Sequence, residues 1–301
     1  MRPGDRAEGE RLLAALADYE AANSPLPGIA PNGNRVALIE QLIESERRRR
    51  FVQHLREADL SPLRADPTNA LFDPLKAAAV DQRNGNLDEA FWMVFLFVHF
   101  GRSHRGGWRY ARDVYGHLGT AVWDWPTVSS DPGAFRTWLN ENAAAITSNG
   151  PGGFGNHRKY ERLDRTGEVV ESYVAWVGPE KSHAIRFGLN GAVPEAPRVA
   201  FSRLYLSMTP VKQFGRTARF DYLTTVSRLG LAELEPDRPH LESATGPMTG
   251  ARLLFGSTGQ AHELDQALVR FGDSLELTAD VIEDGVCNWQ KSPAAFRPFR
   301  G

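Results

Sequence analysis

Apolar side chains recur at helical spacing along most of the chain. Between residues 8 and 21, Leu12, Leu16 and Tyr19 fall on one side of a helix, and Pro25 shortly afterwards indicates its end. The same period predicts further helices over residues 35–58, 75–82, 88–100 and 131–147, and again within 199–230, 240–255 and 264–289. The pattern therefore indicates a mostly α fold.

Residues that start or stop helices refine this picture. Asp131 followed by Pro132 is typical of a capped helix start. The expected breaks in the C-terminal third are Gly230, Gly256 and Gly272. The apolar run from residue 91 to 100 is about half as long as a bilayer span requires, so we interpret it as a buried helix and expect no membrane partner.

One stretch lacks the helical period. Residues 168–187 are rich in β-branched and aromatic side chains, among them Val169, Tyr173 and Val177. Such composition favours strands, so we expect a small β insert here, either a short hairpin or an irregular segment.

Composition narrows the class of protein. With 301 residues and 42% hydrophobic content, the chain can bury the core of one large domain or two packed lobes. Its net charge of −2 excludes a broadly basic surface but leaves room for a local basic groove. Cys287 is the single cysteine, which excludes an internal disulfide or a cysteine-rich zinc site. We expect a cytoplasmic monomer that needs no metal and no cofactor.

A short motif occurs twice. Phe-Gly-Arg-Ser-His-Arg begins at residue 100, and Phe-Gly-Arg-Thr-Ala-Arg begins at residue 214. In each copy the glycine permits a tight turn, the hydroxyl residue can cap a following helix, and two arginines lie three apart. A capped helix with solvated arginines would explain either copy alone, but the recurrence favours phosphate binding. The expected DNA-binding side chains are Arg102, His104, Arg105, Arg216 and Arg219.

Three further segments carry candidate chemistry. A glycine-rich turn within residues 244–254 looks like the hairpin of a helix-hairpin-helix element, in which Gly246 and Thr249 would contact a DNA phosphate. Many helix connections contain two glycines, so this pattern is weak by itself. The run of arginines over residues 47–50 is typical of a solvated helix face, with phosphate contact as the alternative.

The glycine-rich stretch over residues 152–160 is the third segment. Its glycines let the backbone approach a ligand, and its aromatic rings offer surfaces for a base, although a mobile surface loop is the alternative. The expected base-binding residues are Trp108, Phe154, Asn156 and His157, with Arg158 and Lys159 on the DNA backbone.

A catalytic carboxylate is expected on one of two helices. Positions 280, 284, 288 and 291 share one side of the last predicted helix, where acids, amides and a lysine converge. An exposed amphipathic helix would show the same stripe. The catalytic candidates are Asp284, Glu283 and Asp221, with Asn288 and Lys291 as substrate ligands. Cys287 has no histidine nearby in sequence and is interpreted as packing.

These motifs together resemble the third clade of the α-glutamyl/putrescinyl thymine pyrophosphorylases, a family similar to helix-hairpin-helix DNA glycosylases. The resemblance rests on residues 100–108, 152–160, 214–223, 244–247 and 283–292 and extends over residues 88–301. It implies a glycosylase-like helical domain over 88–301, preceded by a helical segment over 1–87, the two packing separately or as one unit. The chain departs from the glycosylase pattern because it lacks a Leu-Pro-Gly-Val-Gly hairpin. Asp265 is another candidate for the aspartate of that pattern.

The resemblance implies chemistry on hypermodified pyrimidines of double-stranded phage DNA. The first hypothesis is a monofunctional glycosylase that excises a base such as glucosylated hydroxymethylcytosine and leaves an abasic site, in antiviral defence. The second is a transferase that replaces pyrophosphate on activated 5-hydroxymethyluracil with an amine. The third is a DNA-binding module without catalytic activity.

Overall fold

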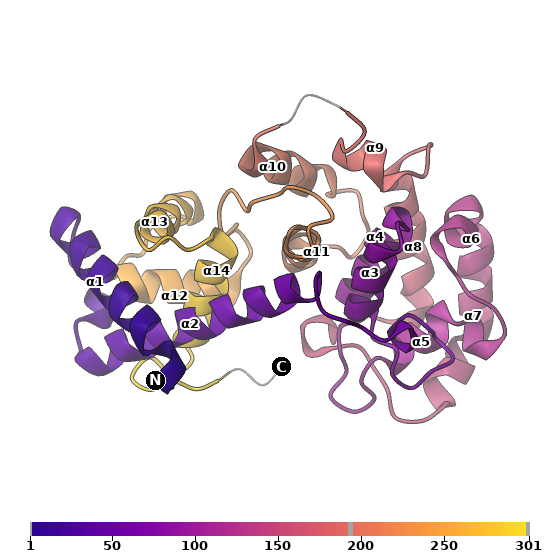
Figure 1. Cartoon of the computed structure of the whole chain (residues 1–301), viewed down its shortest axis with the longest axis horizontal. Helices are drawn as coiled ribbons and strands as arrows, with labels where there is room; N and C mark the ends of the chain where they lie inside the picture. Colours follow the sequence, from indigo (N-terminus) through magenta and orange to yellow (C-terminus); the bar gives the residue numbers. More distant parts are fainter. Residues whose placement is uncertain (1, 192–194, 299–301) are drawn as a thin grey trace. The chain divides into compact units, whose positions relative to one another are not determined.

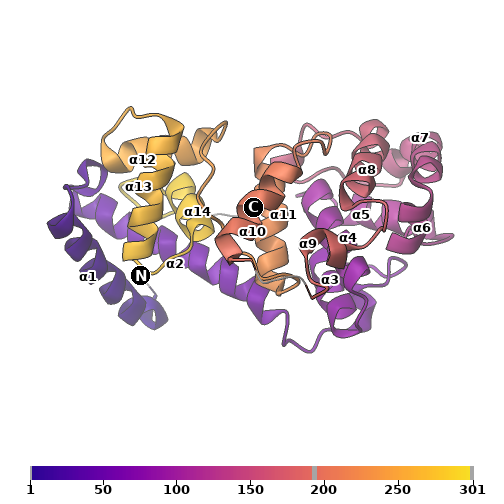
Figure 2. The same ribbon diagram turned by 90° about the horizontal axis from the view of Figure 1, so that it is seen from above.

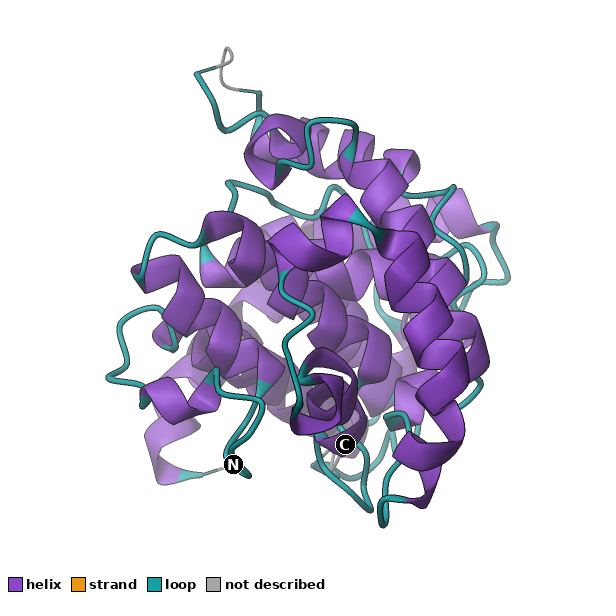
Figure 3. Cartoon of the chain, turned by 90° about the vertical axis from the view of Figure 1, so that its right-hand side faces the viewer, coloured by secondary structure: helices purple, strands orange, loops and turns teal. Residues whose placement is uncertain are grey.

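The protein is mostly α-helical. The computed structural model describes residues 2–191 and 195–298, and Figure 3 shows these as helices joined by loops. An isolated antiparallel bridge joins Ser103 and Gly107. The predicted mostly α fold is confirmed. Among the described residues, no helix combines the length and apolar character that would let it cross a bilayer.

The chain divides into two compact units. The first contains the described residues of 1–52 and 235–300, and the second contains residues 53–234. The first unit is built from the helices α1 (Arg6–Ala22), α2 (Asn32–His54, up to residue 52), α12 (Thr245–Phe255), α13 (Ala261–Ser274) and α14 (Ala279–Trp289). The second holds α3 (Pro74–Arg83), α4 (Leu87–Phe100), α5 (Arg109–Tyr115), α6 (Trp125–Ser130), α7 (Pro132–Ser148), α8 (Leu163–Val177), α9 (His183–Phe187), α10 (Pro197–Ser207) and α11 (Arg216–Leu229).

The core of the first unit joins the two ends of the sequence. Figures 1 and 2 show α12, α13 and α14 packed on one another, with α1 against α13. Leu12 and Leu38 from the N-terminal helices are buried in the same apolar cluster as Phe271 and Trp289. Burial of large apolar side chains, each contributing about 1.5–3 kcal/mol, holds these segments together although they are far apart in sequence.

The predicted hairpin at residues 244–254 is wrong, because this segment forms the helix α12. Its glycines serve helix packing. A Cβ atom on Gly250 would lie 2.4 Å from the carbonyl oxygen of Val286, and one on Gly246 would lie 2.7 Å from the sulfur of Cys287. The glycines therefore let α12 approach α14 closely, which no larger residue would permit.

The second unit is built around α4. This helix packs against α3 and α11, and Phe91, Trp92 and Phe95 on it are fully buried. The interpretation of this apolar run as a buried helix is confirmed. The ring of Tyr173 on α8 stacks on Phe95 with centroids 4.0 Å apart, so aromatic packing links α4 to α8.

The β insert expected at 168–187 is wrong, because these residues lie in α8 and α9. Val169, Tyr173 and Trp176 are spaced as one helical face, and all three are buried in the second unit. α8 also packs along α7. Tertiary burial of this face outweighs the modest preference of β-branched residues for strands.

Helix ends follow the expected signals in three of four places. The Asp131 side chain accepts a hydrogen bond of 2.9 Å from the amide of Ala134, which confirms the cap. Gly230 and Gly256 end α11 and α12 in the left-handed conformation, as expected. Gly272 lies inside α13, so the predicted break there is wrong; the chain turns after Ser274 instead.

Glu89, in the first turn of α4, makes stability depend on pH. Its carboxylate accepts hydrogen bonds from the backbone of Trp125 at 2.6 Å and the hydroxyl of Tyr115 at 2.9 Å. Burial raises the pKa of Glu89 from 4.5 to about 7; these hydrogen bonds oppose the shift, and the charges of Asp81 and Asp124 add to it.

A protonated Glu89 is therefore favoured by folding. Because the folded pKa lies above the unfolded value, this contribution is complete below pH 4.5 and is lost as the pH rises to about 7. We expect the loss to be about 3 kcal/mol. Urea denaturation at several pH values checks this, and the pH dependence should be smaller in Glu89→Gln. Superimposable pH profiles for the two proteins would contradict the assignment.

Candidate functional site

The first Phe-Gly-Arg turn ends a helix. Gly101, with a φ of 61°, terminates α4, and the chain then forms a small loop closed by two backbone hydrogen bonds between Ser103 and Gly107. Ser103 closes this loop and does not cap α5, which begins at Arg109, so the expectation of a capping serine is wrong here. Arg102, His104 and Arg105 are exposed on the loop.

The second Phe-Gly-Arg turn begins a helix. Gly215 is the N-cap of α11 and Arg216 is its first residue, so Thr217 lies inside the helix and does not cap it. The guanidinium of Arg216 lies 4.8 Å from the ring centre of Phe220. The two copies of the motif therefore have different backbone structures, and only their arginines are comparable.

The arginine Arg219 is engaged within the protein. Its guanidinium lies 4.5 Å from the ring centre of Tyr205 and donates a hydrogen bond of 2.9 Å to the hydroxyl of Thr209. These contacts orient Arg219 along α10 and stabilise the packing of α10 on α11.

The glycine-rich segment lies directly against the first turn. The amide of Gly155 donates a 2.7 Å hydrogen bond to the carbonyl of Phe100. A Cβ atom on Gly155 would lie 2.8 Å from the Cα atom of Gly101, so both glycines are needed for this crossing. Two motifs that are about fifty residues apart in sequence are thereby brought together in the second unit.

Arg109 fixes the start of the glycine-rich segment. Its guanidinium donates to the carbonyls of Ile146, Gly150 and Pro151 at 2.7–2.9 Å and pairs with Asp113 at 2.8 Å. Both charged side chains are buried. One buried side chain therefore fixes the backbone that leads into the glycine-rich segment.

The expected base-binding residues differ in exposure. Phe154 is half-buried, stacked on Phe100 with centroids 5.4 Å apart and packed edge-on against Tyr110. Asn156 and His157 are exposed on a short 3₁₀ turn, Asn156–Arg158. Lys159 is also exposed, with its ammonium 5.0 Å from the ring centre of Tyr160. Phe154 thus supports the segment, while the polar side chains beside it face solvent.

Arg158 joins this segment to α11. Its Nε donates to the carbonyl of Val98 at 2.8 Å, and its Nη2 lies 3.6 Å from a carboxylate oxygen of Asp221. The Arg158 side chain is 9% exposed, whereas that of Asp221 is 42% exposed. Burial lowers the pKa of Arg158, and the charges of Asp221 and Glu161 oppose this shift. An accessible carboxylate therefore lies beside a buried cation.

Glu161 belongs to the same cluster and was not among the sequence candidates. Burial raises the pKa of its carboxyl group, while Arg158 and Arg165 act in the opposite direction. Its Oε2 is buried without a hydrogen-bond partner among the described residues, as is the Nη2 of Arg158. A lone acid outside any repeated motif gave no signal in the sequence.

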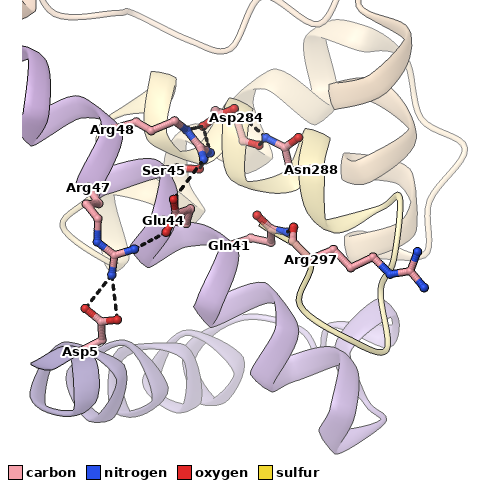
Figure 4. Close-up of polar contacts among 9 residues, drawn as sticks. All are labelled: Asp5, Gln41, Glu44, Ser45, Arg47, Arg48, Asp284, Asn288 and Arg297. Atoms are coloured by element: carbon pink, nitrogen blue, oxygen red, sulfur yellow. Dashed lines mark hydrogen bonds and ion pairs between the residues drawn. The ribbon is translucent and has the colours of Figure 1, made fainter. Parts of the chain in front are cut away.

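The other carboxylate candidates lie in the first unit (Figure 4). Asp284 on α14 accepts hydrogen bonds from Arg48 at 3.1 Å and from the side chain of Asn288 at 2.8 Å. Lys291 donates to the oxygen of Asn288 at 3.0 Å, so the predicted stripe exists as a chain of hydrogen bonds. Glu283, next to Asp284, is half-buried. Both oxygens of Asp284 are thus engaged by protein groups.

The arginine run on α2 is also paired with acids. Arg47 makes two hydrogen bonds of 2.8 Å to Asp5, while Arg49 and Arg50 pair with Glu46. Figure 4 shows that Arg47 and Arg48 share Glu44, and that Arg47 also reaches Asp5 while Arg48 reaches Asp284. These ion pairs favour a structural role for the run over phosphate contact.

Thr249 on α12 donates to the carbonyl of Thr245 within its own helix. Gly246 faces Cys287, as described above.

In the part of the chain that the structure describes, no group of three or more His, Cys, Asp or Glu side chains is arranged to hold a metal ion.

The second unit therefore brings together most of the sequence candidates. Arg102, Arg105 and Trp108 line a cavity of about 630 Å³ beside the start of the glycine-rich segment. Arg158 and Asp221 lie at the end of that segment. This part of the second unit carries cations around a small number of carboxylates. Such a charge distribution suits a polyanionic substrate such as DNA.

Comparison with known proteins identifies a family. The model of one family, alpha-glutamyl/putrescinyl thymine pyrophosphorylase clade 3, matches residues 33–301. Searches of curated proteins and of solved structures gave no significant match. The family match begins upstream of residue 88, so it includes nearly all of α2 and the whole of α3. Since it spans most of both units, the chain belongs to the alpha-glutamyl/putrescinyl thymine pyrophosphorylase family, clade 3.

Proposed function

We propose that the protein is an enzyme that acts on double-stranded DNA carrying modified bases and hydrolyses the N-glycosidic bond of a hypermodified pyrimidine. The family name, which refers to thymine, supports a pyrimidine substrate. The observation that carries the proposal is the accessible Asp221 carboxylate beside the buried Arg158 guanidinium. Release of such bases from phage DNA would serve antiviral defence.

Asp221 suits the chemistry of glycosidic cleavage. Breaking the bond between C1′ of the deoxyribose and N1 of the base leaves positive charge on the sugar, and a nearby carboxylate stabilises this charge. The bonding electrons leave with the base, which takes a proton from solvent. A water oxygen bonds to C1′, and Asp221 accepts the proton that this water loses.

Arg158 has a positioning role in this scheme. Its Nε is fixed on the carbonyl of Val98, and its Nη2 is directed to Asp221. Through this contact Arg158 restrains the carboxylate that is to face the sugar cation. Asn156 and His157, exposed on the adjacent 3₁₀ turn, offer polar groups for a base that is flipped out of the duplex.

The family name supports a second candidate function. In a transferase, an amine nitrogen would bond to the 5-methylene carbon of activated hydroxymethyluracil. The carbon–oxygen bond would break, pyrophosphate would leave with its electrons, and the amine would release a proton to solvent. The exposed Lys159 and Arg102 could bind such a leaving group. This reaction requires cations near the base and leaves the glycosidic bond intact.

Product analysis separates the two reactions. The protein is incubated with phage DNA that contains glucosylated hydroxymethylcytosine, and the products are analysed by mass spectrometry and by alkaline cleavage. We expect free modified base and alkali-labile sites. DNA whose backbone survives alkali, together with pyrophosphate release and an amine-linked base from activated thymine DNA, would replace the first function by the second.

A further inference from the structure

A cavity in the second unit has a strongly cationic lining. It is lined by residues 64–76, which lead into α3, by residues 102–112, which run from the first Phe-Gly-Arg turn into α5, and by Pro151. Its volume of about 630 Å³ is within the range of ligand-binding pockets. Its lining includes six cationic side chains and one carboxylate, that of Asp73: the cations are Arg64, Lys76, Arg102, Arg105, Arg109 and Arg112.

Four of these cations are held by protein groups. Arg109 is buried among carbonyls and Asp113, as described above. Arg112 lies 3.3 Å from Asp113, Arg64 donates to the carbonyl of Leu71, and Lys76 is 3.9 Å from Asp73. These contacts orient the cations, but the two carboxylates, those of Asp73 and Asp113, cannot neutralise the four positive charges.

Arg102 and Arg105 are the uncompensated pair. Both are exposed, and neither guanidinium makes a hydrogen bond or ion pair with any other residue in the parts of the chain that the structure describes. A guanidinium presents a planar set of donors that matches the oxygens of a phosphate. The cavity therefore combines excess positive charge with donors that are free to bind an anion.

The cavity wall is held in place by packing. Trp108 contacts Phe97 of α4, with ring centroids 5.4 Å apart. A Cβ atom on Gly106 would lie 2.2 Å from the carbonyl oxygen of Pro151, so the turn is fitted tightly against the glycine-rich segment. The donors thus project from a supported backbone, which limits the entropy lost on binding.

We propose that this cavity binds phosphate groups, with Arg102 and Arg105 as the principal ligands and Arg64, Lys76 and Arg112 as supporting cations. The inference rests on the proposed function for the source of the phosphate, which is the backbone of the DNA near the target base. Free pyrophosphate has the same chemistry and is the second source. Binding here positions DNA and does not itself break a bond.

The test uses the full chain and the double variant Arg102→Gln/Arg105→Gln. Binding of a short duplex is measured by fluorescence anisotropy at several salt concentrations, and binding of inorganic pyrophosphate alone is measured by calorimetry. Arg203→Gln, which alters an exposed arginine on α10 paired with Glu195, is the matched control. Melting temperatures of all variants verify folding.

We expect the double variant to bind duplex about 10- to 100-fold more weakly at 0.1 M salt, with the salt slope reduced by about two. Loss of pyrophosphate binding with unchanged duplex binding would also support the site and would make free pyrophosphate the source. Unchanged binding of both ligands would overturn the inference. Base release by Asp221 variants is measured independently of DNA binding. A failure of the proposed function can therefore be distinguished from a failure of this phosphate site.

Discussion

Asp221→Asn is expected to reduce base release by about 10²- to 10⁴-fold while duplex affinity stays near that of the unaltered protein. Asparagine keeps an oxygen near Arg158 but carries no charge to stabilise the sugar cation and cannot accept the proton from water. Single-turnover assays measure the rate, and anisotropy measures binding. A loss of kcat without a comparable loss of affinity identifies a residue that acts in the chemical step.

Asp284→Asn is the matched control, because it changes a carboxylate of the same type that is already engaged by Arg48 and Asn288. We expect its catalytic rate to stay within a few-fold of the unaltered protein, with a small loss of stability, about 1 kcal/mol. The reverse result, an inactive Asp284→Asn and an active Asp221→Asn, would place the chemistry on α14.

Arg109→Ala is expected to lower the free energy of unfolding by about 3–5 kcal/mol. The substitution leaves Asp113 buried with its main partner removed, and it removes the donors of three backbone carbonyls. Six of the seven tryptophans lie within residues 53–234, so tryptophan fluorescence during urea denaturation reports mainly on this unit. Hydrogen exchange should also increase over residues 150–155.

Arg112→Ala provides the comparison for this effect. Arg112 contacts the same carboxylate, but only at 3.3 Å and from a more exposed position. We expect its removal to cost less than about 1 kcal/mol. Equal losses for the two variants would show that burial of Arg109 has no special energetic role.

Local features of the fold could be predicted from the sequence. Helical periodicity found most of the helices, including α4, and side-chain caps such as Asp131 were readable because a cap depends on residues only a few positions apart. Residues 168–187 were misread because their side chains favour strands in isolation. Packing against α7, and the stacking of Tyr173 on Phe95 of α4, decide for a helix.

Contacts between distant segments could not be predicted in the same way. The two Phe-Gly-Arg motifs were found from the sequence. Although the motifs are similar, the first ends a helix and the second begins one. Periodicity also cannot show that Arg158 meets Asp221, or that Arg109 fixes carbonyls about forty residues away. The roles of the candidate residues therefore depend on contacts that arise only when the chain folds.

The first unit is assembled from both ends of the chain, with the second unit inserted between them. During synthesis, the apolar faces of α1 and α2 emerge well before Phe271 and Trp289 of the same cluster are made. The inserted unit has all of its own helices available earlier. Folding on the ribosome should thus begin in the inserted unit, while α1 and α2 remain exposed to chaperones until α13 and α14 have been made.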